Sequence, residues 1–261
     1  MTNSKQQSAL SKEQIDSVIA LYSAGQYQEA INQIKILNDL YPNTPFLFNL
    51  IGACYKSLGQ LEGSAKMFET AVNIKSDYAE AHKNLGITLK DLGRLDAAVE
   101  SLNRAIAIDP NYVDAHYNLA ITLKDLNQFD DAVKSYQKVL EVNPNFAQAY
   151  NNLGNLLKDL GQTDESIKNY QKAIEINPNF AHAYNNLGNA FKDLEKLKEA
   201  VSHYEKAIEE NPNFSEAHNN LGNVFKDLGE LDNAINSYQK AALLDNTQYE
   251  SYYNLGVVFI Q

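Results

Sequence analysis

The chain has 261 residues, of which 44% are hydrophobic and 21% charged, values typical of a folded protein. Its formal net charge of −11, with no run of Lys or Arg, makes nucleic acid and an anionic membrane surface poor candidate partners, because both repel an acidic chain. The one cysteine, Cys54, excludes an intrachain disulfide. No secretory signal and no apolar run of about 18 residues is present, so we expect a cytoplasmic location.

A repeat of 34 residues organises the sequence, since Asn-Pro-Asn recurs at Asn143, Asn177 and Asn211. Asn-Leu-Gly recurs in the same phase. We expect residues 1–10 to be disordered and residues 11–261 to form one solenoid. Its predicted repeats, numbered 1 to 8, are 11–44, 45–78, 79–112, 113–146, 147–180, 181–214, 215–248 and a partial repeat at 249–261.

Each repeat is predicted to be a helix, a turn and a second helix. In repeat 5 the apolar residues Ala149, Leu153 and Leu157 recur every four residues, as on one face of a helix. Gly161 then marks a turn, and Pro178 ends the second helix because proline cannot continue one. At the start of repeat 1, Ser11 and Gln14 have the spacing of a capping box.

The small and large residues of each repeat resemble those of the tetratricopeptide repeat family. Repeat 3 holds them in order at His82, Leu85, Gly86, Leu89, Gly93, Leu95, Ala98, Leu102, Ala105 and Pro110. The resemblance covers residues 11–261. It implies an all-α fold, a right-handed superhelical solenoid of stacked helix-turn-helix hairpins, with the first helices lining a concave surface.

Packing explains these residues. Glycines such as Gly86, Gly154 and Gly188 are expected where the two helices of a hairpin approach most closely. Aromatic residues such as Tyr170 and Tyr204 are expected to fill the wider gap to the next hairpin. One hairpin cannot bury its apolar face alone, so neighbours must stack.

Polar residues recur on the side of the first helices that is predicted to face away from the core. Counted from the start of each repeat, positions 2, 5, 6, 9, 12 and 13 share the side opposite the core. Position 6 is Asn84, Asn118, Asn152, Asn186, Asn220 and Asn254. Position 5 is Asn151, Asn185 and Asn219, position 9 is Asn155, Asn189 and Asn223, and position 12 includes Lys158, Lys192 and Lys226. Asp recurs at position 13, where it would pair with these lysines.

Amides on a groove suit an extended peptide, because each offers one acceptor and two donors to a main chain. Such a ladder resembles the repeat arm of the O-linked N-acetylglucosamine transferases, which implies that these asparagines clamp a peptide backbone. Recent duplication is the alternative, since repeats 5 and 6 share 21 of 34 residues. Against it, positions 6, 12 and 13 hardly change while positions 16, 18, 22 and 23 vary.

We therefore predict a scaffold that binds a protein or an extended peptide, with no catalytic residues, no metal and no cofactor. The alternative is the substrate-recruiting arm of a larger enzyme of the glycosyltransferase or sulfotransferase type. Reading of RNA by the repeats is a third class, which the acidic charge opposes. Cys54 and the histidines have no partners at catalytic or metal-binding spacing.

The sequence stops within repeat 8, after one predicted helix. Its core face would carry Tyr252, Leu255, Gly256 and Phe259, with Val258 and Ile260 nearby. Because a solenoid end without a polar cap tends to associate, we expect self-association through residues 249–261, and a longer native chain.

Overall fold

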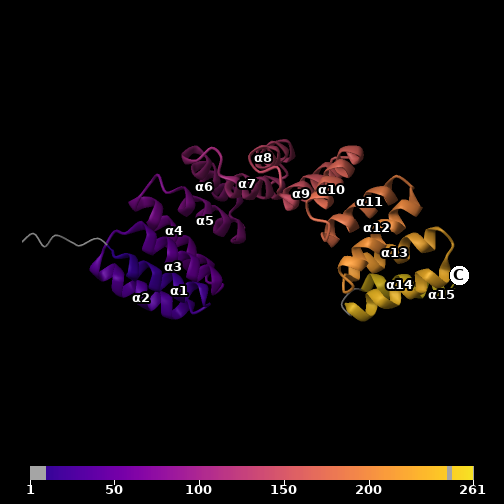
Figure 1. Ribbon diagram of the computed structural model, residues 1–261, viewed down its shortest axis with the longest axis horizontal. Helices are drawn as coiled ribbons and strands as arrows, with labels where there is room; N and C mark the ends of the chain where they lie inside the picture. Colours follow the sequence, from indigo (N-terminus) through magenta and orange to yellow (C-terminus); the bar gives the residue numbers. More distant parts are fainter. Residues whose placement is uncertain (1–9, 246–248, 261) are drawn as a thin grey trace, which may run out of the picture. The chain divides into compact units, whose positions relative to one another are not determined.

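The computed structural model describes residues 10–245 and 249–260, which form fifteen α-helices and no strand (Figure 1). The predicted all-α fold is confirmed. The chain divides into two compact halves, Met1–Lys138 and Val139–Gln261. That both halves continue one right-handed solenoid stays a prediction.

The helices follow the repeats in pairs. The first repeats contain α1 (Lys12–Ser23), α2 (Tyr27–Leu40), α3 (Pro45–Ser57), α4 (Leu61–Ile74), α5 (Ala79–Asp91), α6 (Leu95–Ile108), α7 (Val113–Asp125) and α8 (Phe129–Val142). The later repeats contain α9 (Ala147–Asp159), α10 (Thr163–Ile176), α11 (Ala181–Asp193), α12 (Leu197–Glu210), α13 (Ser215–Asp227), α14 (Leu231–Leu244) and α15 (Tyr249–Ile260).

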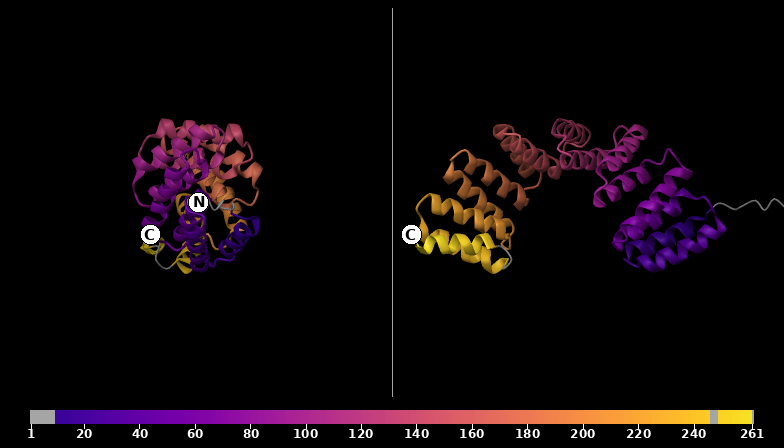
Figure 2. Two further views of the ribbon diagram at one scale, coloured as in Figure 1. Left: turned by 90° about the vertical axis from the view of Figure 1, so that its left-hand side faces the viewer. Right: turned by 180° about the vertical axis from the view of Figure 1, so that it is seen from behind.

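In repeats 1 to 3 and 5 to 7 the two helices of a repeat pack as a hairpin, and the second helix also packs against the first helix of the next repeat. In the N-terminal half α4 joins α3 to α5, and in the C-terminal half α12 joins α11 to α13. The pairs are visible from both sides in Figures 1 and 2. Each hairpin therefore buries the apolar face of its neighbour, as the repeat pattern predicts.

Glycine marks the closest approach within a hairpin. A Cβ on Gly188 would lie 2.7 Å from Cε1 of Tyr204, and one on Gly86 would lie 2.6 Å from Cγ of Leu102. The Tyr170 ring packs over Gly154 and also contacts Leu187 of the next repeat. The predicted roles of the glycines and aromatic residues are thus confirmed.

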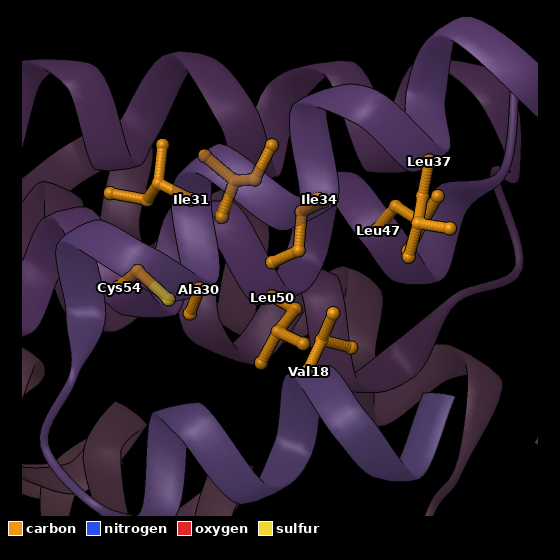
Figure 3. Close-up of a cluster of buried hydrophobic side chains, with 9 residues drawn as sticks. Val18, Ala30, Ile31, Ile34, Leu37, Leu47, Leu50 and Cys54 are labelled. Carbon is orange, nitrogen blue, oxygen red and sulfur yellow. The ribbon is translucent and has the colours of Figure 1, made fainter. Parts of the chain in front are cut away.

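Repeat 1 departs from the family pattern but is well packed. Val18 of α1 is fully buried beside Ile31 and Ile34 of α2 and Leu50 of α3 (Figure 3). Ser17, at a position that is Leu in most repeats, instead bonds to the side chain of Gln33. The first hairpin therefore builds its core with other residues.

The turns follow local chemistry. Gly161 has φ 75°, and Asn127 and Glu195 take the same left-handed conformation at 59° and 58°. In the Asn-Pro-Asn segment, Oδ1 of Asn177 accepts from the backbone N–H of Asn179 at 3.2 Å. This bond closes a side-chain turn after α10. The capping box of Ser11 and Gln14 is confirmed.

Some predictions fall at the chain ends. Of residues 1–10 only Leu10 is described, and it packs against the core of repeats 1 and 2. The side chains of Val258, Phe259 and Ile260 lie outside the described residues. Tyr252 and Tyr253 of α15 are 50% and 72% exposed. Self-association through residues 249–261 stays a prediction.

Candidate binding surface

The first helices of the C-terminal half are joined by paired asparagine amides. Nδ2 of Asn186 donates to Oδ1 of Asn151 at 2.9 Å, and Nδ2 of Asn220 donates to Oδ1 of Asn185 at 3.0 Å. Asn254 reaches Asn219 in the same way at 3.4 Å. These pairs, which we call the amide ladder, connect position 6 of one repeat to position 5 of the repeat before it.

Burial separates these two positions. Asn151, Asn185 and Asn219 are only 6%, 1% and 4% exposed, so the expectation that position 5 lies on the surface is wrong for them. The next first helix covers that side of each helix, which a projection of a single helix does not show. A buried amide needs partners, and the ladder supplies one of them. Position 5 thus holds the ladder together.

Position 9 is held by a buried tyrosine of the same repeat. The hydroxyl of Tyr170 donates to Oδ1 of Asn155 at 2.8 Å, and that of Tyr204 donates to Oδ1 of Asn189 at 2.7 Å. Tyr238 makes the same bond to Asn223. With its oxygen held in this way, each position-9 amide keeps its NH₂ group for another partner.

Burial raises the pKa of Tyr170 and Tyr204 above the usual value for a phenol, and nearby carboxylates, Asp193 among them, raise it further. Both hydroxyls therefore stay protonated and act as donors throughout the physiological range. In this arrangement each hydroxyl donates to the amide oxygen, so the NH₂ group lies on the other side of the amide.

Repeats 2 and 3 have an apolar pair of residues at the positions of this asparagine and tyrosine. Ala53 of α3 is combined with Phe68 of α4, and Ile87 of α5 with Leu102 of α6. In repeats 2 and 3 the second residue of the pair is fully or nearly fully buried, as the tyrosines are. Repeat 4 has a third combination, with the buried Tyr136 beside Ile121. Asparagine at position 9 thus always has this tyrosine in its repeat, whereas the tyrosine also occurs without the asparagine.

Position 6 offers the opposite chemistry. Asn186 and Asn220 are half-buried and use one N–H in the ladder, while their Oδ1 atoms accept no bond from the described residues. Asn152 accepts from Nδ2 of its neighbour Asn151 at 3.4 Å. At Asn186 and Asn220, position 6 therefore presents an acceptor, and position 9 presents a donor about 4.5 Å away along the same helix.

The ladder is partial in the N-terminal half. Nδ2 of Asn84 donates to Oδ1 of Asn49 at 3.1 Å, which adds Asn49 to the predicted set. Asn118 differs, because its Nδ2 donates to the backbone oxygen of Asp114 on its own helix at 2.7 Å. Asn49 was missed because no other residue of repeat 2 repeats the asparagine pattern.

Some of the lysines at position 12 pair with an aspartate of the following repeat. Lys158 lies 3.4 Å from Asp193, and Lys56 lies 3.1 Å from Asp91. Partial burial would raise the pKa of Asp91, but hydrogen bonds from Lys56 and Lys90 outweigh it and hold this pKa below its usual value. Lys192 and Lys226 make no ion pair with any described residue. Such exposed pairs contribute little stability.

The remaining reactive groups have structural surroundings. Burial raises the pKa of Cys54 to about 11, so its thiol is a poor nucleophile. Nε2 of His82 lies 3.0 Å from the backbone oxygen of Ser76, and His116 and His218 repeat this contact at their own loops. Among the described residues no cluster of three His, Cys, Asp or Glu side chains has the arrangement of a metal site.

In the described part of the chain, every helix is too short or too polar to cross a bilayer.

Stacked helical hairpins with repeated polar side chains on the first helices define a helical-repeat scaffold for protein interaction. The family model for the TPR repeat matches residues 52–93, 88–126, 122–161, 154–195, 188–229 and 222–261. The chain therefore belongs to the TPR repeat family. No curated protein sequence matches it.

Solved structures support the fold. The crystal structure of MamA is 28% identical and covers 62% of this chain and 95% of its own, with a TM-score of 0.59. YrrB, a TPR protein with an unusual peptide-binding site, is 21% identical over 72% of this chain and 97% of its own, with a TM-score of 0.58. A TPR protein from Cytophaga hutchinsonii is 18% identical over 92% and 98%, with a TM-score of 0.71.

Proposed function

We propose that this protein is a non-catalytic scaffold that binds an extended segment of another protein along α9, α11 and α13. The position-6 oxygens of Asn186 and Asn220 accept from backbone N–H groups of the segment. Position-9 NH₂ groups of Asn155, Asn189 and Asn223 donate to its backbone oxygens. Lys158, Lys192 and Lys226 lie at the ends of the same helices. Binding of a peptide by YrrB, which shares the fold, is consistent with this use of the family.

The fixed orientation of the amides is the observation that carries the proposal. A free Asn side chain must lose rotational freedom on binding, whereas these are already held by Tyr170, Tyr204 and the amide ladder. If the asparagines had been retained only because the repeats were duplicated, buried hydroxyls that orient their side chains would have no role. The regular order of acceptor and donor matches a main chain, which presents N–H and C=O groups in alternation.

Replacing the polar pairs by apolar ones tests the proposal without orphaning a buried group. We would combine Asn155→Ile with Tyr170→Phe and Asn189→Ile with Tyr204→Phe, following the apolar pairs of repeats 2 and 3. Losing both partners of a hydrogen bond is close to neutral for stability. The melting temperature should therefore change little.

The binding probe is a set of peptides selected from a random twelve-residue library displayed on phage against the unchanged chain. Their affinity for the four-substitution variant should fall about tenfold or more, because two amide donors worth about 1 kcal/mol each are lost. N-methylation of the peptide backbone should weaken binding more than replacing most of its side chains by Ala. Equal affinity for both proteins would favour duplication as the origin of the asparagines.

A further inference from the structure

A cavity of about 640 Å³ opens on the first helices of the N-terminal half. Its walls come from α1, α3, α4 and α5, and include Ile19, Phe46, Leu50, Ala53 and Phe68. The volume lies in the range of ligand-binding pockets, about 300–1,000 Å³. Positions 6 and 9, which hold amides in the C-terminal half, here hold Leu50 and Ala53. This part of the surface therefore offers apolar contact.

One wall of the cavity is polar. Asn49 and Asn84, joined at 3.1 Å, both line it, so a pair of the amide ladder borders the apolar floor. Oδ1 of Asn84 accepts no hydrogen bond from the described residues. The cavity thus combines an acceptor for a backbone N–H with space for a side chain.

Of the two charged residues that line the cavity, Lys56 has an ion pair and Glu80 has none with the described residues. The ammonium group of Lys56 lies 3.1 Å from Asp91, which also pairs with Lys90 at 3.2 Å. Glu80 lies on the exposed rim and meets only the amide of Asn49, at 3.5 Å, with no ion pair to any described residue. An occupant that brings a cation next to an apolar group would complement this carboxylate.

We propose that this cavity binds one large apolar side chain of an extended segment, with a Lys or Arg beside it in the segment facing Glu80. This inference rests on the proposed function, since it applies the same capture of a backbone by amides to the first helices of the N-terminal half and names the side chains preferred there. The Asn49–Asn84 pair holds the backbone at the cavity, and Leu50, Ala53 and Phe68 contact the apolar side chain.

The same peptide selection tests this preference. Peptides selected on the unchanged chain should be enriched in a large apolar residue next to Lys or Arg. Ala53→Arg, which fills the half-buried cavity wall, should weaken their binding about tenfold or more. Ala97→Arg, the same change on the exposed surface of α6, should leave binding unchanged. Selection on Glu80→Gln should lose the basic residue and keep the apolar one.

Two results would each overturn the inference. One is the absence of an apolar–basic pair of residues from the selected peptides, and the other is that these peptides bind Ala53→Arg as tightly as the unchanged chain. If Ala53→Arg fails to melt cooperatively, replacement of the apolar peptide residue by Ser takes its place and should weaken binding equally.

The two proposals fail separately. Loss of binding in the four-substitution variant with full binding to Ala53→Arg would support the amide surface and overturn the cavity inference. The reverse result would support the cavity and overturn the amide surface as the binding site. No enrichment on the unchanged chain would overturn both.

Discussion

Glu195 takes the left-handed turn conformation, with φ 58°, at a place where five other repeats have glycine. A side chain in this conformation destabilises the folded protein by about 1–2 kcal/mol. Glycine removes this strain, but it also makes the unfolded chain more flexible, which offsets part of the gain in stability. Glu195→Gly should therefore stabilise the protein by about 0.5–1 kcal/mol. Thermal and urea unfolding measure the change. Glu195→Ala, which keeps the strain, should bring no gain, and equal gains in both variants would contradict this account.

His203 of α12 lies parallel to the ring of Phe191, with ring centroids 5.1 Å apart and planes at 8°. Burial lowers the pKa of His203 below its usual value, although Glu199 opposes this effect. The unfolded chain then binds a proton at a higher pH than the folded one. The stability that the neutral His203 contributes is fully present above the pKa of the unfolded chain, about 6.5, and is lost as the pH falls through this value.

The loss of melting temperature between about pH 7.5 and pH 5 should thus be smaller in His203→Gln than in the unchanged protein. His182→Gln, at an exposed side chain, is the matched control. An identical loss in the unchanged protein and in His203→Gln would show that His203 does not contribute to the pH dependence.

Sequence alone located the asparagines but not their roles. A projection of one helix puts positions 5 and 6 on the same polar side, yet Asn185 is 1% exposed and Asn186 is half-buried. The difference arises because the next repeat covers one edge of each first helix, and this depends on how hairpins stack. The bond from Tyr204 to Asn189 was only partly within reach of the sequence, because every repeat with Asn at position 9 has this tyrosine, but repeat 4 combines Tyr136 with Ile121.

At the scale of the helices, the two helices of a hairpin approach each other most closely at a glycine of the first helix. Gly188→Ala would place a Cβ 2.7 Å from the Tyr204 ring, a fully buried side chain with little freedom to move. We expect a loss of about 1–3 kcal/mol in the free energy of unfolding. Urea unfolding of the purified variant gives this value directly.

Gly63 of α4 provides the control for this prediction. A Cβ there would meet only Tyr55, at an ordinary 3.4 Å. Gly63→Ala should stabilise the protein by up to about 1 kcal/mol, since alanine is the better helix former. Destabilisation of similar size in both variants would mean that the hairpin contact is not what sets the requirement for Gly188.

The residues at which the helices begin were the feature of the fold that the sequence predicted best. First helices begin at Pro45, Ala79 and Ala147, where the repeat register places them, because glycine turns and the Asn-Pro-Asn segments leave few alternatives. The turn at Asn177 was less accessible. Pro178 predicts that α10 ends. The sequence does not show that the backbone N–H of Asn179 donates to the side chain of Asn177, which is the bond that shapes the turn.

At the scale of the whole molecule, the same fold carries two kinds of surface. The first helices of the C-terminal half present oriented amides, as at Asn155 and Asn189, which suit a backbone. Those of the N-terminal half include an apolar cavity around Leu50 and Ala53. Under the two proposals, the C-terminal half binds extended segments with little regard to their side chains, and the N-terminal half prefers an apolar residue next to a basic one.

The central claim is that the amides of the first helices contact the bound segment. NMR of the ¹⁵N-labelled protein observes each Asn side-chain NH₂ group separately. On addition of a selected peptide, the NH₂ signals of Asn155 and Asn189 should shift, because these groups gain an acceptor. Signals of Asn169 on α10 and Asn233 on α14, which bond within their own helices or caps, should stay in place. Shifts confined to Asn169 and Asn233, with Asn155 and Asn189 unchanged, would contradict the account.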